Sequence, residues 1–110
     1  MTREDAVREV VRRLVDYYQP ERIYLIGSTA RGEHRPDSDL DFVVVLSDDA
    51  SREKLIGGGI HRRLRGIPSA VDVVAFRRST FEARAKWLMT LPAIALREGK
   101  LEYDASALSR

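Results

Sequence analysis

Three aspartates lie in or beside segments with the pattern of β-strands. Asp39 and Asp41 stand two residues apart where the apolar run 40–46 begins, and Asp72 lies inside a second apolar run, residues 70–76. Because successive side chains of a strand point to opposite faces, Asp39 and Asp41 are expected on the same side. A carboxylate among valines carries a large desolvation cost unless something pairs with it. If the two strands are neighbours, the three carboxylates converge on one spot.

Such a cluster of carboxylates calls for a cation. Like charges that share a site raise each other's pKa unless a positive charge neutralises them. Mg²⁺ suits this task because it takes one or two protein carboxylates, keeps some waters and uses substrate phosphates as further ligands. We therefore expect Asp39, Asp41 and Asp72 to bind Mg²⁺ together with a phosphorylated substrate.

A glycine and a serine follow the predicted strand 22–26 and suit phosphate binding. Gly27 tolerates any backbone angle, and Ser28 then presents its hydroxyl and backbone N–H at a strand-to-helix turn, a common anion site. We call Gly27 and Ser28 the phosphate cradle. Arg31 lies close enough in the chain to reach a phosphate with its planar guanidinium. A phosphate cradle beside a carboxylate metal site is the equipment for phosphoryl or nucleotidyl transfer.

Each of these features also has a structural explanation. An Asp-x-Asp pair often caps a turn, and Asp37 and Ser38, which follow Pro36, suit that role. A Gly-Ser pair after a strand is a weak signal, and one buried aspartate is often a satisfied polar group of the core. All of these explanations would have to hold together at this spacing, so the site interpretation is favoured.

The spacing resembles that of a known family. Gly27-Ser28, ten intervening residues and Asp39-x-Asp41 are similar to the motif of the DNA polymerase beta nucleotidyltransferase superfamily, and residues 27–41 look like its minimal nucleotidyltransferase (MNT) branch. Asp72 falls where that family has its third carboxylate. The resemblance implies an α/β (α+β) fold, with a short mixed sheet and helices packed on one side.

The same resemblance implies a chemistry. It implies that two Mg²⁺ ions are bound when a nucleotide is present and that ATP is the nucleotide donor. Asp39 and Asp41 would bind both ions, while Asp72 would help to bind one ion and activate the acceptor hydroxyl. The residues expected to hold the nucleotide are Gly27, Ser28 and Arg31.

Three functions are compatible with these residues. The leading hypothesis is an enzyme that moves AMP from ATP onto a hydroxyl of a partner protein, because a chain this small has little room for an acceptor-holding module. The resemblance implies that the partner is a HEPN-domain toxin and that this chain is its antitoxin. The alternative is a non-catalytic antitoxin that neutralises its partner by forming a complex. Metal-dependent phosphoester hydrolysis would use the same ligands but lacks an evident extra base.

The composition of the chain indicates what kind of protein carries this site. The chain has 110 residues, 44% hydrophobic and 33% charged, which predicts a single globular domain over residues 1–110. It has no cysteine, no apolar stretch of membrane-spanning length and no signal-peptide core, so we expect a cytoplasmic protein. The net charge of +2 is too small to indicate direct nucleic-acid binding. The basic cluster 62–65 is interpreted as a solvated helix face.

Start and stop signals predict the remaining elements. Thr2 and Asp5 form a capping box for a first helix, and Ser79 and Glu82 form another for a later one. The glycine triplet 57–59 lies inside a predicted helix, where we interpret it as a hinge or close-packing point rather than a second phosphate cradle. The predicted elements are a first helix ended by Pro20, strands at 22–26, 40–46 and 70–76, a helical turn near 29–32, a helix that fills part of 51–65, a helix opened by Ser79, a helix with Pro92 in its first turn and Gly99 at its end, and a last strand or docked tail at 101–103.

Overall fold

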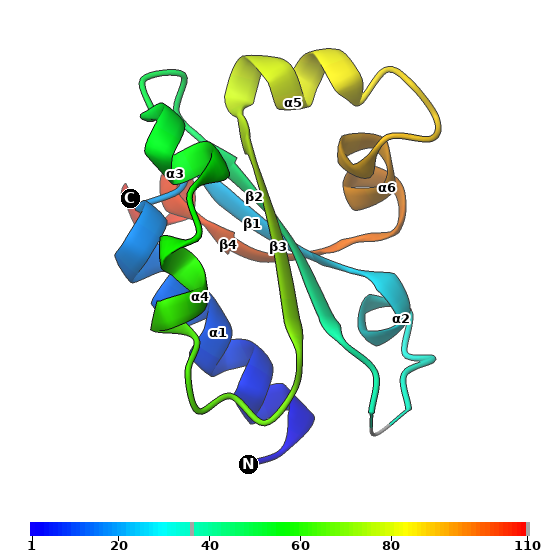
Figure 1. The fold of residues 1–110 in the computed structure, drawn as a ribbon. Coiled ribbons are helices and arrows are strands. Elements are labelled where there is room, and N and C mark those ends of the chain that lie inside the picture. The colour runs from blue at the N-terminus through cyan, green and yellow to red at the C-terminus, as the bar shows by residue number, and fades with distance from the viewer. Residues whose placement is uncertain (36, 110) are drawn as a thin grey trace.

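The structure is a computed structural model that describes residues 1–35 and 37–109, so Pro36 of the predicted turn lies outside the described residues. One mixed sheet runs through the centre of the described part, with helices on both of its faces (Figure 1). The elements in chain order are α1 (Arg3–Tyr18), β1 (Arg22–Ile26), α2 (Gly27–Ala30), β2 (Leu40–Leu46), α3 (Arg52–Ile56), α4 (Gly59–Arg63), β3 (Val71–Arg77), α5 (Arg78–Arg84), α6 (Leu91–Glu98), β4 (Lys100–Asp104) and a short 3₁₀-helix (Ala105–Ser109).

The described strands pair in the order β3-β2-β1-β4. β2 and β3 are parallel, whereas β1 is antiparallel to both β2 and β4. The α+β class and the mixed sheet are thereby confirmed, and the segment 101–103 forms a strand. A parallel pair needs a crossover connection, and α3 and α4 provide it between β2 and β3.

Two apolar clusters fill the two faces of the sheet. On one face, Val10 and Leu14 of α1 pack with Phe42 of β2. On the other face, Val43 of β2 packs with Phe81 of α5, and α6 also contributes to this cluster. The helices therefore lie on both sides of the sheet, not on one side as expected. The reason is that six of the seven residues of β2 are buried, so both faces of this strand need a cover.

The glycine triplet divides the predicted helix 51–65 into α3 and α4. A Cβ at Gly57 would lie 2.4 Å from the carbonyl oxygen of Glu53, and a Cβ at Gly59 would lie 2.5 Å from the hydroxyl of Tyr17. The triplet is therefore both a helix break and a point where α4 packs closely on α1. No side chain larger than hydrogen fits at either position without a shift.

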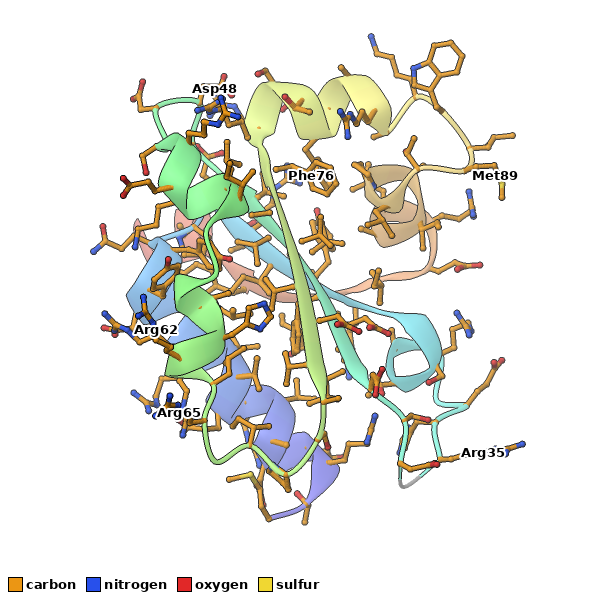
Figure 2. The ribbon with its side chains drawn as sticks, viewed as in Figure 1. Arg35, Asp48, Arg62, Arg65, Phe76 and Met89 are labelled. Carbon is orange, nitrogen blue, oxygen red and sulfur yellow. The ribbon has the colours of Figure 1, made fainter. Side chains whose placement is uncertain are left out.

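Most predicted helix ends are confirmed, and one is wrong. The capping box of Thr2 and Asp5 opens α1, and α6 has Pro92 in its first turn and Gly99 as its C-cap. The predicted box at Ser79 does not form, because the N-cap of α5 is Arg77. Instead the carboxylate of Asp48 accepts the Ser79 N–H at 2.9 Å, and Figure 2 shows Asp48 beside the start of α5.

In the part of the chain that the structure describes, each helix is too short or too polar to cross a lipid bilayer.

Candidate active site

Asp41 and Asp72 face each other across the parallel pair β2–β3. They are register partners, and their side chains lie on the sheet face covered at its far end by α5 and α6. Leu40 and Phe42 point to the opposite face, where they join the core under α1. The alternation of β2 therefore separates the carboxylates from the larger apolar cluster. Asp39 precedes β2 and is exposed.

Asp72 is exposed, although it lies inside the apolar run 70–76. β3 is an edge strand of the sheet, and its side chains alternate between partly buried and exposed positions up to Val74. α5 and α6 cover only the end of β3 that carries Phe76, which lies beneath α5 (Figure 2). The carboxylate therefore opens to solvent and does not pay the cost of a buried charge.

The electrostatics of the site centre on Asp41. Partial burial raises the pKa of its carboxyl, and the negative charge of Asp72 raises it further. The two carboxyls are also close enough to share a hydrogen bond, and the charge of Asp39 adds a smaller upward shift of the pKa. The structure thus places the carboxyls of Asp41 and Asp72 side by side on neighbouring strands and puts that of Asp39 within electrostatic reach.

Gly27 sits directly against Asp41. The last residue of β1, Ile26, is the register partner of Asp41, so the chain turns into α2 at this point. Gly27 has φ +79°, and a Cβ there would lie 2.7 Å from Oδ2 of Asp41. Both the backbone angle and the lack of space require glycine. The phosphate cradle and the carboxylates are therefore parts of one site.

The two other residues expected to bind nucleotide occupy different settings. Ser28 is half-buried at the start of α2, one residue from the contact with Asp41. Arg31 caps the end of α2, where its guanidinium lies 3.2 Å from Glu33 and 4.0 Å from Glu98. To bind a phosphate, Arg31 would have to exchange these carboxylates for it, which costs little because exposed ion pairs are weak.

The residues fit a hard cation that arrives with its substrate. Among residues 1–35 and 37–109, no group of three or more His, Cys, Asp or Glu could hold a metal ion by itself. The neighbouring carboxyls of Asp41 and Asp72 would nevertheless supply the one or two oxygen ligands that Mg²⁺ takes from protein when phosphates provide others. Burial and the neighbouring charge of Asp72 both raise the pKa of Asp41, and a bound cation would offset both effects.

Arg3, which the sequence analysis did not single out, joins the two halves of the site. Its guanidinium donates to the hydroxyl of Thr29 at 3.1 and 2.8 Å. It also donates to the main-chain carbonyls of Ser38 and Asp39. No local pattern marks Arg3, because these partners lie 26 to 36 residues further along the chain.

We expect Asp41→Asn to stabilise the metal-free protein more as the pH rises. The folded pKa of Asp41 is raised, so the folded state binds the proton more tightly than the unfolded state does. The resulting stability is present below about pH 4 and is lost as the pH rises through the folded pKa. Asparagine keeps the shape without the charge. Thermal denaturation in EDTA between about pH 4 and pH 7 should show a growing advantage of the variant.

The exposed loop residue Asp49 offers the control, since Asp49→Asn removes one carboxylate away from the site. An advantage of Asp41→Asn that shrinks as the pH rises would show that the folded pKa of Asp41 is not raised.

The sequence model of the nucleotidyltransferase domain family matches residues 6–105 of this chain. No curated protein matches the chain significantly. The family match covers nearly the whole chain and includes the phosphate cradle and all three aspartates.

Three solved structures share the fold. A protein of Sulfolobus solfataricus assigned as a nucleotidyltransferase is 18% identical, with a TM-score of 0.62 over 93% of this chain and 80% of that one. A chain of a toxin–antitoxin structure with AMP-PNP is 19% identical, with a TM-score of 0.59 over 91% and 74%. Spectinomycin adenyltransferase of Enterococcus faecialis, solved with ATP and spectinomycin, is 16% identical, with a TM-score of 0.68 over 94% and 57%. At these identities the likeness shows the fold alone.

Proposed function

This chain belongs to the nucleotidyltransferase domain family, and on that premise we propose that it transfers AMP from ATP, with Mg²⁺, onto a hydroxyl of a partner protein. The contact that carries the proposal is the one between Gly27 and Asp41, because it joins a phosphate-binding turn to a pair of carboxylates. A structural role alone gives no reason for like charges to lie side by side at an open position of the sheet.

The proposed reaction is a displacement at the α-phosphorus of ATP. The acceptor oxygen attacks this phosphorus, and the new P–O bond forms as the bond to the β-phosphate oxygen breaks. Pyrophosphate leaves with the electron pair of that bond. The proton of the acceptor hydroxyl passes to a carboxylate oxygen of Asp72, whose exposure leaves it accessible to an acceptor.

The chain's own residues position the reactants. Backbone N–H groups and the hydroxyl of Ser28 would bind the triphosphate at the phosphate cradle. Asp39, Asp41 and Asp72 would hold Mg²⁺, which when bound neutralises charge on the phosphates. Arg31 would exchange its carboxylate partners for a phosphate oxygen as the nucleotide enters.

An exposed apolar surface supports a protein as the acceptor. Trp87, Leu88 and Met89, in the loop between α5 and α6, are 70%, 76% and 88% exposed. Contiguous exposed apolar residues mark interaction sites on soluble domains, and tryptophan is frequent at the centre of protein interfaces. Figure 2 shows Met89 projecting from this loop. α5 and α6 cover the sheet face that also carries Asp41, so the loop lies on the same side of the sheet as the site.

A toxin–antitoxin pair is the setting we propose for this reaction. One structural neighbour is a toxin–antitoxin structure that contains AMP-PNP, and another is an adenyltransferase with bound ATP. The partner would be a HEPN-domain toxin, as the motif Gly27-Ser28…Asp39-x-Asp41 implies through its resemblance to minimal nucleotidyltransferases. Purification with the neighbouring gene product, followed by its intact mass in ATP and Mg²⁺, tests the proposal. A mass increase of one AMP supports it, and an unchanged mass contradicts it.

Ser28→Ala should weaken the binding of Mg·ATP by about 2 kcal/mol, the loss of one hydrogen bond to a charged group. Isothermal titration calorimetry measures this change. Ser47→Ala is the matched control, because Ser47 follows the opposite end of β2 from Asp41. Unchanged affinity in Ser28→Ala would mean that its hydroxyl does not contact the triphosphate.

A further inference from the structure

Arg3 reaches three segments at once. It is the first residue of α1, and its half-buried side chain extends to α2 and to the loop that precedes β2. One guanidinium nitrogen donates to Thr29 Oγ1 at 2.8 Å, to the carbonyl of Asp39 at 3.1 Å and to the carbonyl of Ser38. A second nitrogen donates to the same Thr29 oxygen at 3.1 Å.

We infer that Arg3 is a positioning residue that fixes Asp39 relative to the phosphate cradle. Thr29 follows Ser28 directly, and the carbonyl of Asp39 belongs to the residue whose carboxylate is to bind the cation. The inference rests on the proposed function for its catalytic consequence. Its geometric part, one guanidinium clamped between α2 and the start of β2, is independent of the reaction.

The chemistry of the guanidinium explains why arginine suits this position. Its donors lie in one rigid plane, so a single side chain serves a hydroxyl and two carbonyls in fixed directions. The ammonium of a lysine is a compact point charge on a flexible stem, and it cannot reproduce this pattern. The charge also strengthens each hydrogen bond to an uncharged acceptor.

The base of the clamp is held in place by α1. The capping box of Thr2 and Asp5 fixes the helix start on both sides of Arg3. Ala6 and Val7, in the next turn, are buried in the core. Arg3 therefore starts from a fixed backbone, while the loop it holds has exposed residues along most of its length. The packed helix α1 therefore restrains the exposed loop through the side chain of Arg3.

The experiment compares Arg3→Met with the wild-type protein in binding and in turnover. In EDTA, the affinity for ATP should change less than about threefold, because the phosphate cradle is intact. With Mg²⁺, the affinity for ATP and the kcat of transfer should each fall about 10- to 100-fold, the usual effect of losing a residue that supports a metal ligand. Hydrogen exchange should accelerate at the amides of Glu33 and Ser38, both of which donate within this loop region.

Arg12→Met is the matched control. Arg12 lies on the same helix, and its side chain is 68% exposed and pairs with Glu9 of that helix. Arg12→Met should leave the affinity for ATP, the kcat of transfer and the hydrogen exchange of the loop amides unchanged. Thr29→Val removes the shared hydroxyl acceptor and keeps the shape of the side chain. Combined with Arg3→Met, it should cause no further loss of Mg-dependent affinity, because both changes break the same contact.

Two results would overturn the inference. One is equal loss of ATP affinity with and without Mg²⁺ in Arg3→Met, which would indicate a direct nucleotide contact or general unfolding. The other is wild-type behaviour of Arg3→Met in all three measurements. Should Arg3→Met unfold, Arg3→Lys and Thr29→Val decide, with the same expected Mg-dependence. A wild-type protein that transfers no AMP contradicts the proposed function, while binding and exchange still test Arg3.

Discussion

Asp72→Asn should abolish the transfer of labelled AMP to the co-purified partner and leave the complex intact. Asparagine keeps the size of the side chain but cannot accept the acceptor proton, and it removes one charge from the cation site. Loss of a general base costs about 10²- to 10⁴-fold in rate. Asp39 and Asp41 remain, so Mg·ATP should still bind. Intact mass spectrometry of the partner after incubation with ATP and Mg²⁺ measures the transfer.

The control for Asp72→Asn is Asp49→Asn, which removes an exposed carboxylate outside the site and should transfer AMP at the wild-type rate. Wild-type activity in Asp72→Asn would exclude Asp72 as the base. A second comparison distinguishes an enzyme from a non-catalytic binding subunit. If the wild-type protein leaves the mass of the partner unchanged, yet inhibits it as well as Asp72→Asn does, the non-catalytic antitoxin is the correct function.

Gly27→Ala is expected to lower both stability and nucleotide binding. The backbone at φ +79° disfavours any residue with a Cβ, and this Cβ would meet Oδ2 of Asp41 at 2.7 Å. Strain of this kind costs about 1–3 kcal/mol. Because the clash pushes on Asp41 itself, Mg·ATP affinity should fall by a further factor of about 10 or more. Urea denaturation and calorimetry measure the two effects separately.

Gly66→Ala is the control that distinguishes the effect of backbone strain from the effect of a steric clash with Asp41. Gly66 has φ +89°, close to the value at Gly27, but no atom lies within 4 Å of a Cβ placed there. Gly66 lies in the loop between α4 and β3. Gly66→Ala should therefore lose stability and keep its affinity for Mg·ATP. Equal affinities in Gly27→Ala and Gly66→Ala would mean that the approach of Gly27 to Asp41 has no part in binding.

Local rules were enough to predict most elements of this fold. The strands at 22–26 and 40–46 appear with the predicted bounds, because their apolar runs end at Gly27 and begin after Asp39. The helix α1 begins at its predicted cap, because Thr2 and Asp5 satisfy each other's backbone N–H groups within one turn. The family inferred from residues 27–41 is confirmed by the match over residues 6–105.

Contacts between distant segments account for what was missed. Ser79 does not cap α5, because the N-cap is Arg77, and the carboxylate of Asp48, 31 residues earlier in the chain, accepts the N–H of Ser79. The helices lie on both faces because β2 is buried on both sides. Neither fact follows from a local pattern, since each depends on which segment lies beside which.

The sequence by itself determined the candidate residues of the site. The spacing of Asp39 and Asp41 and the turn at Gly27 follow from strand periodicity and backbone freedom, which are properties of neighbouring residues. Only the tertiary structure decided that Asp72 is open to solvent, because this depends on β3 being the edge of the sheet. It alone also brought Arg3 to Thr29 and Asp39, because hydrogen bonds across 26 and 36 residues require the folded chain.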